Sequence, residues 1–310
     1  MPEIQRWTVT EPYLDVQGQL FEGPYYDEAR NHLRWVDILE EKLYILDLAR
    51  GPESLKVLDT GVPLGVTANL ATTPDPAKDE IVVGAKHGYA TLDLQTGKTT
   101  YIRKVWTDAD GPGKEQRMRF NDGAVDSRGR FWAGMMTDLK LGELVHEGVL
   151  FRLDPDLSLH RMIEGMGISN GIGWSLDDRT MYITDTPTRN IFAYDFDAET
   201  GQISNRRVFF TPPGDTAMPD GFAMDEEGHL WVALWDGSRV LRVSPQGQIV
   251  GEISLPARCV TCATFVGTDL YITTANEKGS GESDRYGGKL YRVNVGVRGK
   301  PKDAFRLTSP

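Results

Sequence analysis

The chain has few of the features that mark disulfide-bonded, membrane-spanning or secreted proteins. Its 310 residues include only two cysteines, Cys259 and Cys262, and no second Cys or His pair accompanies their Cys-x-x-Cys spacing to complete a zinc site. We expect two reduced thiols on opposite faces of a strand. No run of 18 apolar residues occurs, and the first residues lack the apolar region of a signal peptide. These absences predict a cytoplasmic protein with no membrane partner.

The chain also lacks the positive charge and the motifs of several protein classes. Its 34 Lys and Arg residues are outnumbered by 45 Asp and Glu residues, for a net charge of -11, which argues against nucleic acid as a partner. The five histidines are scattered, and none lies in a His-Glu-x-x-His motif. No Gly-x-Ser-x-Gly elbow or glycine-rich phosphate loop occurs, so the sequence disfavours serine hydrolases and nucleotide-binding proteins.

The sequence is dominated by a repeat of short apolar strands and polar turns. Each unit has a marker residue in a strand that is followed by a turn and another strand, and the markers recur every 40 to 50 residues: Trp35, Val82, Trp132, Tyr182, Trp231 and Tyr271. Six such units with almost no helical periodicity predict an all-β protein, a six-bladed β-propeller with four-stranded antiparallel blades. A β-sandwich is the alternative, but a sandwich gives no reason for this interval.

The ends of the chain and one loop complete the predicted architecture. No linker or change of composition divides the sequence, so residues 1–310 are expected to form a single propeller domain. Residues 7–10 and 305–307 are expected to pair in one sheet, which would close the ring and hide open strand edges. The Gly- and Ser-rich residues 279–288 are expected to form a flexible flap or a crossover at the rim.

Polar residues recur in the same phase as the markers. Each lies 11 to 13 residues before the marker of its unit: Glu22, Asn121, Asn170 and Asp220. Asn-Gly and Asp-Gly pairs favour turns in any context, and Pro219-Asp220-Gly221 is expected to be a tight turn. In a propeller, however, residues just before the innermost strands surround one mouth of the central channel. The shared phase therefore predicts a ring of oxygen-bearing side chains.

Such a ring predicts a central metal site. Converging carboxylates and amides would repel one another or lack partners unless a positive charge lay between them. Oxygen ligands favour one hard divalent ion, Ca²⁺, Mg²⁺ or Mn²⁺, with Zn²⁺ less typical. Glu22 and Asp220 would neutralise this ion, and water or substrate would complete its coordination.

The motifs around the ring resemble those of a known family. They are Phe21-Glu22-Gly23-Pro24, Arg119-Phe120-Asn121-Asp122-Gly123, Ile168-Ser169-Asn170-Gly171 and Pro219-Asp220-Gly221, and in order and spacing they look like the regucalcin (senescence marker protein) and gluconolactonase family. The resemblance implies a six-bladed propeller with one divalent metal near its axis. It implies that Glu22, Asn170 and Asp220 are the metal ligands, with Asp220 also the candidate general base, and that Arg119 and Asn121 contact a sugar-lactone substrate.

One segment departs from the family pattern. The regucalcin branch has an acidic substrate contact shortly after the segment Gly134-Met135-Met136, and here Leu139 occupies the matching place. Asp138, one residue earlier, is the candidate substitute.

Together these observations predict a metal-dependent lactonase that hydrolyses an aldonolactone to the open-chain aldonic acid. The expected partner is the small-molecule lactone, and the expected assembly is a monomer or a weak homodimer. A non-enzymatic Ca²⁺-binding regulatory propeller and a metal-dependent phosphotriester or aryl ester hydrolase remain as alternatives. A propeller used only for protein interaction is disfavoured because it would not need the ring of ligands.

Overall fold

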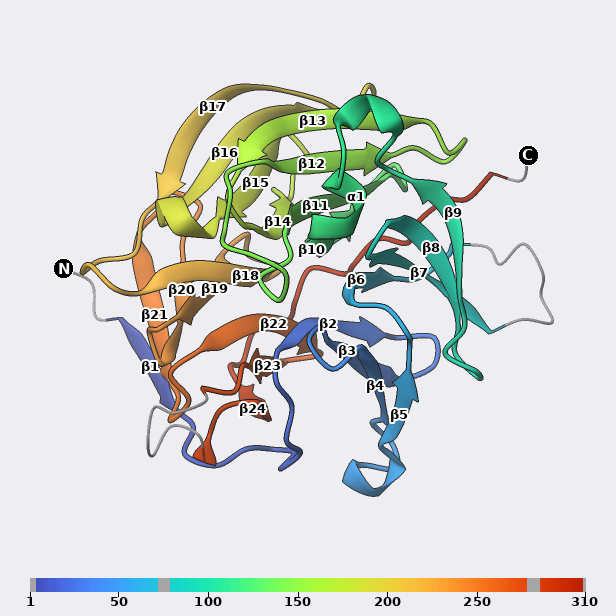
Figure 1. Cartoon of the computed structure of the whole chain (residues 1–310). Helices are drawn as coiled ribbons and strands as arrows, with labels where there is room; N and C mark the ends of the chain where they lie inside the picture. Colours follow the sequence, from blue (N-terminus) through green and yellow to red (C-terminus); the bar gives the residue numbers. More distant parts are fainter. Residues whose placement is uncertain (1–3, 72–78, 278–284, 309–310) are drawn as a thin grey trace.

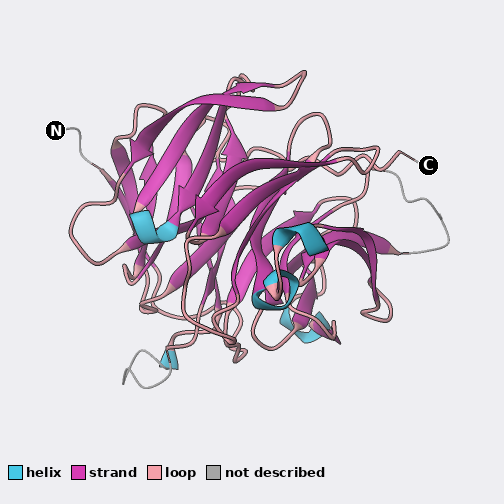
Figure 2. Cartoon of the chain, turned by 45° about the horizontal axis from the view of Figure 1, so that its top comes forward, coloured by secondary structure: helices cyan, strands magenta, loops and turns pink. Residues whose placement is uncertain are grey.

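The computed structural model describes residues 4–71, 79–277 and 285–308. Its strands form six sheets around a central channel, as the blades of a propeller (Figure 1). Helical structure in the described ranges consists of short loop segments (Figure 2), which include η1 (Pro52–Ser54), η2 (Asp108–Asp110), α1 (Lys114–Arg117) and η3 (Thr186–Thr188). No described helix is long and apolar enough to cross a membrane. The prediction of an all-β six-bladed propeller is confirmed.

Four of the blades are four-stranded antiparallel sheets whose strands follow one another in the chain. They comprise β2 (Phe21–Asp27), β3 (His32–Asp37), β4 (Lys42–Asp47) and β5 (Lys56–Asp59); β6 (Leu64–Ala68), β7 (Glu80–Ala85), β8 (Gly88–Asp93) and β9 (Thr99–Lys104); β10 (Met118–Val125), β11 (Phe131–Thr137), β12 (Gly148–Leu153) and β13 (Leu159–Met166); and β14 (Ser169–Trp174), β15 (Thr180–Asp185), β16 (Asn190–Asp197) and β17 (Gln202–Phe210). In each blade the first strand lies innermost.

The last two blades are completed by the N-terminal part of the chain. The fifth contains β18 (Met218–Met224), β19 (Leu230–Trp235), β20 (Arg239–Val243) and β21 (Ile249–Ser254), and β1 (Gln5–Thr8) is added in parallel to β21. The sixth contains β22 (Val260–Val266), β23 (Asp269–Thr274) and β24 (Leu290–Asn294), and Leu14 bridges to Leu290 at its outer edge.

Apolar packing between the blades positions the inner strands. The markers lie in the second strand of each blade, and Trp35, Trp132 and Trp231 are completely buried. All seven residues of β11 are buried, because neighbouring blades cover both of its faces, whereas the outermost strand β17 is mostly exposed. A one-residue slip of an inner strand would turn its side chains to the wrong face, so this packing also fixes the register at the channel.

The predicted closure of the ring is wrong. Residues 7–10 and 305–307 do not pair with each other: β1 pairs with β21, while Phe305 forms a parallel bridge to Leu70 beside β6. The two termini therefore protect different blades. The sequence pattern shows that strand edges must be covered, but it does not show which outer edge each terminal segment reaches. The predicted loop at 279–288 lies largely outside the described residues.

A C-terminal strap, residues 298–308, crosses the end of the channel at which the innermost strands finish. We call this end the strap mouth and the opposite end the site mouth. The backbone of the strap bonds to blades five, two and three and to the loop after β12, through Met224, Glu226, Asn69, Ala71, Gly129 and Pro155. Lys300 Nζ donates to the carbonyl of Trp174, and Lys302 Nζ donates to that of Pro24. The strap is thereby hydrogen-bonded to five of the six blades.

Candidate metal and substrate site

Every innermost strand has a β-bulge near its start, towards the site mouth. The register shifts fall between Glu22 and Tyr25, Leu64 and Val66, Phe120 and Asp122, Asn170 and Ile172, Pro219 and Phe222, and Val260 and Cys262. A bulge interrupts the ladder and re-aims a side chain. Of the four predicted ring residues, Asn121 and Asp220 lie inside these bulges, and Glu22 and Asn170 are the last paired residues before them. The shared phase seen in the sequence therefore reflects a repeated backbone irregularity.

Pro219-Asp220-Gly221 is part of strand β18, and the prediction of a tight turn here is wrong. The bulge accommodates Pro219, which has no N–H to donate to the ladder. The following glycine is needed for packing, because a Cβ on Gly221 would collide with the Cys262 side chain and one on Gly171 would collide with Phe222. The Asp-Gly and Asn-Gly pairs thus let neighbouring blades approach closely.

A chain of hydrogen bonds connects four buried side chains around the site. Arg119 Nη1 donates to Asn121 Oδ1 at 2.8 Å, and Asn121 Nδ2 donates to Asn170 Oδ1 at 2.8 Å. Asn170 Nδ2 donates to Thr186 Oγ1 at 2.8 Å, and Thr186 Oγ1 donates to the Pro219 carbonyl at 2.9 Å. Blades three, four and five are therefore joined at the level of the bulges, and the amide orientations of both asparagines are fixed.

The carboxylates beside this chain are buried without a cationic hydrogen-bond partner. Glu22 and Asp220 are 4% and 3% exposed, and Asp220 Oδ1 has no hydrogen-bond partner. Burial raises the pKa of Glu22 well above its usual value, and the charges of Asp220 and Asp122 raise it further. Burial and Asp122 likewise raise the pKa of Asp220, while the Gly221 N–H and Asn170 partly oppose this. The site therefore has an excess of buried negative charge.

These features fit a divalent cation. A cation would stabilise the ionised forms of the two carboxylates, which destabilise each other's charge. It would also give the unpartnered buried oxygen a partner. Asn121 uses only one lone pair of Asn170 Oδ1, so that oxygen can accept a further partner. Glu22, Asn170 and Asp220 would supply oxygen ligands only, as hard divalent cations prefer. The predicted ligand assignment itself stays a prediction.

A cavity lies on the other side of the ring. Its volume is about 840 Å³, and it extends towards the strap mouth past Tyr25, Asp122, Cys262 and Lys302. Neither Glu22 nor the other three ring residues line it. The volume of a cavity therefore does not by itself identify the candidate site, because six blades around an axis always leave a wide channel. We place the candidate site at the ring, where the unpartnered charges are.

The sequence matches the family described as SMP-30/Gluconolactonase/LRE-like region over residues 20–276. The chain belongs to this family. The matched range includes every bulge of the innermost strands and all the residues of the hydrogen-bonded chain. The family resemblance predicted from the sequence motifs is confirmed.

Several relatives of the family cover nearly the whole chain. Regucalcin of Gallus gallus is 33% identical over 297 residues, which are 93% of this chain and 95% of that protein. Pentonolactonase XacC of Haloferax volcanii is 32% identical over 311 residues, with coverage of 95% and 97%. The crystal structure of a calcium-binding regucalcin from Agrobacterium tumefaciens is 25% identical and superposes with a TM-score of 0.85, covering 98% of this chain and 99% of that one.

Asp138 lies beside Arg119, next to the departure from the family pattern. It is buried, receives a 2.6 Å hydrogen bond from Lys86 Nζ and lies 4.0 Å from Arg119 Nε, which itself has no hydrogen-bond partner. Burial acts to raise the pKa of Asp138, but Lys86 and Arg119 outweigh it and lower the pKa. Leu139 is 52% exposed. Asp138, together with Glu22, is therefore an acidic group that acts on Arg119 in this chain.

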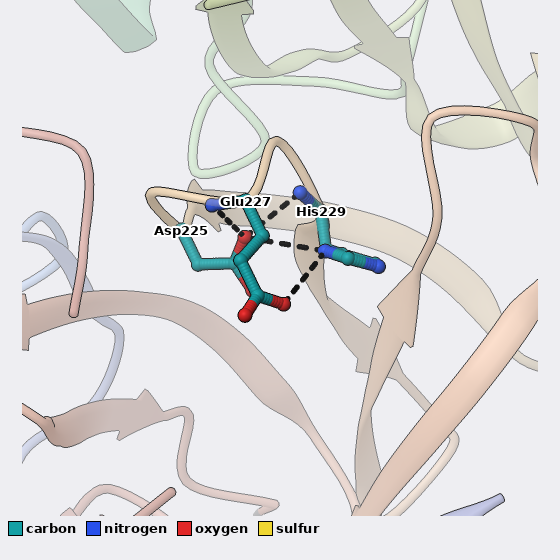
Figure 3. A group of neighbouring side chains, drawn as sticks. All are labelled: Asp225, Glu227 and His229. Atoms are coloured by element: carbon teal, nitrogen blue, oxygen red, sulfur yellow. Dashed lines mark hydrogen bonds and ion pairs between the residues drawn. The ribbon is translucent and has the colours of Figure 1, made fainter. Parts of the chain in front are cut away.

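Asp225, Glu227 and His229 form a second acidic cluster (Figure 3). Among the described residues, they are the only three His, Cys, Asp or Glu side chains whose ligand atoms all lie within 4.8 Å of one another. Arg242 already bonds to Asp225 at 2.7 Å and to Glu227 at 2.6 Å. A metal ion would have to displace this guanidinium.

A repeated motif explains the second cluster as structural. In Asp-x-x-Gly-x-x-Trp, which occurs in blades three and five, the Asp accepts bonds from backbone N–H groups and from the indole of the Trp: Asp126 with Trp132 at 2.9 Å, and Asp225 with Trp231 at 3.0 Å. Each Asp also bonds an arginine, Arg130 or Arg242. Asp126 and Asp225 therefore stabilise hairpin turns between the first and second strands of their blades.

Sequence reasoning missed three residues near the ring. Asp122 follows Asn121 directly, and burial raises its pKa to about 6. Strand alternation would turn it away from Asn121, and only the bulge shows that it affects Glu22 and Asp220. Thr186 and Lys86 come from connections outside the innermost strands, so no phase marks them. The two thiols are free, as expected, but the prediction that both lie in a strand is wrong for Cys259, which directly precedes β22. Both are buried, and Cys259 contacts Asp236 while Cys262 contacts the Ala263 carbonyl.

Proposed function

We propose that the protein is a lactonase that opens a sugar lactone at the ring, with a divalent cation held by Glu22, Asn170 and Asp220. The observation that carries this proposal is the pair of buried carboxylates with raised pKa values and an unpartnered oxygen, directly beside the polar chain from Arg119. Membership of the gluconolactonase-like family and similarity to a pentonolactonase support a cyclic sugar ester as the substrate.

The residues divide the work of hydrolysis as follows. When bound, a divalent cation supplies a positive charge that polarises a carbonyl oxygen and lowers the pKa of water. Asp220 has two carboxylate oxygens; with one of them on the cation, the other would accept the proton of the attacking water as the water oxygen bonds to the lactone carbonyl carbon. The ring C–O bond then breaks, and the proton passes to the departing alkoxide, which becomes a hydroxyl of the aldonic acid.

Arg119 and Asn121 hold the substrate in this scheme. The guanidinium uses Nη1 on Asn121 and the Phe120 carbonyl, and Nε remains unpartnered. Its fixed, forked donors suit a lactone oxygen or the product carboxylate. Asp138, ionised beside Lys86, can accept a hydrogen bond from a sugar hydroxyl. A substrate with a hydroxyl there would be favoured over its deoxy analogue, since buried polar groups left unpaired are costly.

Reconstitution of the metal-stripped protein tests the proposal. Lactone hydrolysis is followed with a pH indicator over a panel of 1,4- and 1,5-lactones, with Ca²⁺, Mg²⁺, Mn²⁺ and Zn²⁺ added one at a time. We expect no activity without metal and recovery with at least one ion. Equal activity with and without metal would refute the role of the cation.

The same assay separates the alternatives. A phosphotriester and an aryl ester are included in the panel, and faster turnover of either would reassign the substrate class. Calcium-binding regucalcin among the structural neighbours favours one other candidate, a Ca²⁺-binding propeller without activity. Tight Ca²⁺ binding with no hydrolysis of any lactone by the wild type would support that candidate instead.

A further inference from the structure

Thr186 is a buried residue that bonds to two of the strands carrying candidate ligands. It begins η3 directly after β15, is 5% exposed, and its N–H donates to the Ile168 carbonyl at 3.1 Å. Its hydroxyl bonds to the Asn170 side chain and to the Pro219 carbonyl, which precedes Asp220. Thr186 thus connects two candidate ligands from a position outside the innermost strands.

The chemistry of its partners fixes the direction of both hydrogen bonds. The Pro219 carbonyl can only accept, so the single proton of the Thr186 hydroxyl is directed towards it. The hydroxyl oxygen then accepts from Asn170, and the group that faces it must be Nδ2. The Asn170 carbonyl oxygen is therefore directed away from Thr186, towards Asn121 and the ring.

The other end of the hydrogen-bonded chain enforces the same direction. Arg119 can only donate, so Asn121 must present Oδ1 to it and Nδ2 to Asn170. Rotating the Asn170 amide by half a turn would place two donors face to face at Asn121. A donor-only group at one end and an acceptor-only group at the other therefore allow a single arrangement of the whole chain.

We propose that Thr186 is a positioning residue that presents the Asn170 amide oxygen, and the strand that carries Asp220, to a divalent cation at the ring. This inference rests on the proposed function only in that a cation binds there; it does not depend on the substrate. Removing the hydroxyl takes away one of the two acceptors of Asn170 Nδ2 in a buried site, leaves the Asp220 carboxyl as the other, and so weakens the hold on the orientation of the amide. The expected effect is on cation affinity.

Cation affinity of the metal-stripped full chain is measured by titration calorimetry with Ca²⁺ and Mn²⁺. Thr186→Val keeps the shape of the side chain and is expected to weaken binding at least about tenfold, the effect of one lost buried hydrogen bond. Thr186→Ser keeps the hydroxyl and should bind within about twofold of the wild type. Thr188→Val is the matched control, because Thr188 Oγ1 lies in the same turn but donates only to the Asp185 carbonyl.

Each outcome decides the inference. Wild-type affinity in folded Thr186→Val, or equal losses in Thr186→Val and Thr188→Val, would overturn it. If Thr186→Val does not fold, Thr186→Ala is measured in its place. A wild type that binds neither ion also overturns it, and lactone hydrolysis by that metal-free protein would show whether the lactonase proposal survives. Weak binding in Thr186→Val with rescue in Thr186→Ser supports the positioning role.

Discussion

Strand β18 has a buried carboxylate near each end, and the surroundings shift the pKa values of the two carboxylates in opposite directions. Asp220, at the bulge, is 3% exposed, has an oxygen without a partner, and its pKa is raised well above the usual value. Asp225, just after the strand, is completely buried, yet Trp231, the His229 N–H and Arg242 overcome the effect of burial and lower its pKa. Two carboxylates that are both nearly inaccessible to solvent thus have opposite pKa shifts, and the unpaired one marks the candidate site.

Neutralising each aspartate in turn should separate catalysis from stability. We expect Asp220→Asn to reduce lactone hydrolysis by about 10²- to 10⁴-fold, the usual contribution of a general base. Asp225→Asn should retain the activity of the wild type per folded molecule, because Asp225 touches none of the ring residues. Initial rates on the best lactone, with metal in excess, measure both. Loss of activity in folded Asp225→Asn alone would reverse the assignment.

Stability should respond in the opposite order. Asp225→Asn leaves Arg242 buried beside a neutral partner, and breaking a buried ion pair costs about 3 to 4 kcal/mol. Asp220→Asn in the metal-free protein should be neutral or stabilising, because it removes a charge that repels Glu22. Urea unfolding of both variants gives the comparison. An equal loss of unfolding free energy in the two would mean that Asp220 is already compensated.

The two carboxylates should also give the fold opposite pH dependences. Burial raises the pKa of Asp122 to about 6, above the 3.8 of an ordinary aspartate, and Glu22 and Asp220 shift in the same direction. The folded state therefore binds more protons than the unfolded state between about pH 4 and 6, and stability must fall as pH rises through this window, by no more than about 3 kcal/mol for Asp122.

Melting temperatures of the metal-free protein from pH 4.5 to 7 measure this fall, and a divalent cation at pH 7 should remove it. Asp122→Asn should flatten the profile. The depressed pKa of Asp225 contributes stability that is lost only as the pH falls below about 4. A metal-free protein that becomes more stable from pH 4.5 to 6 would contradict the excess of buried negative charge at the ring.

The smallest change in the free energy of unfolding is expected when Glu227, the exposed member of the Asp225 cluster, is neutralised. Glu227 bonds to Arg242, but its side chain is 57% exposed. Water and salt screen such a pair, so Glu227→Gln should change the unfolding free energy by less than about 1 kcal/mol. A change as large as that of Asp225→Asn would show that Glu227, rather than Asp225, holds Arg242.

The sequence predicted the blades and the ring better than it predicted local backbone. Periodic markers such as Trp132 and Trp231 and the shared phase of Glu22, Asn170 and Asp220 depend on the repeat itself, and a repeat is visible in one sequence. The bulges are not visible, because Pro-Asp-Gly is compatible with a turn and with an interrupted strand. Thr186 could not be found either, since its role depends on which atoms of Asn170 and Pro219 face it.

The C-terminal strap and β1 together set the order in which the molecule can be assembled during synthesis. The strap is hydrogen-bonded to five blades, and all of them precede it in the chain, so the strap mouth can close only after these blades have been made. Strand β1 is made early, but its partner β21 follows more than two hundred residues later. The first and the last described segments of the chain therefore both depend on contacts with residues distant in sequence, and such contacts form slowly. A growing chain keeps its first strand unpaired until β21 has been made, and its channel open until the strap docks.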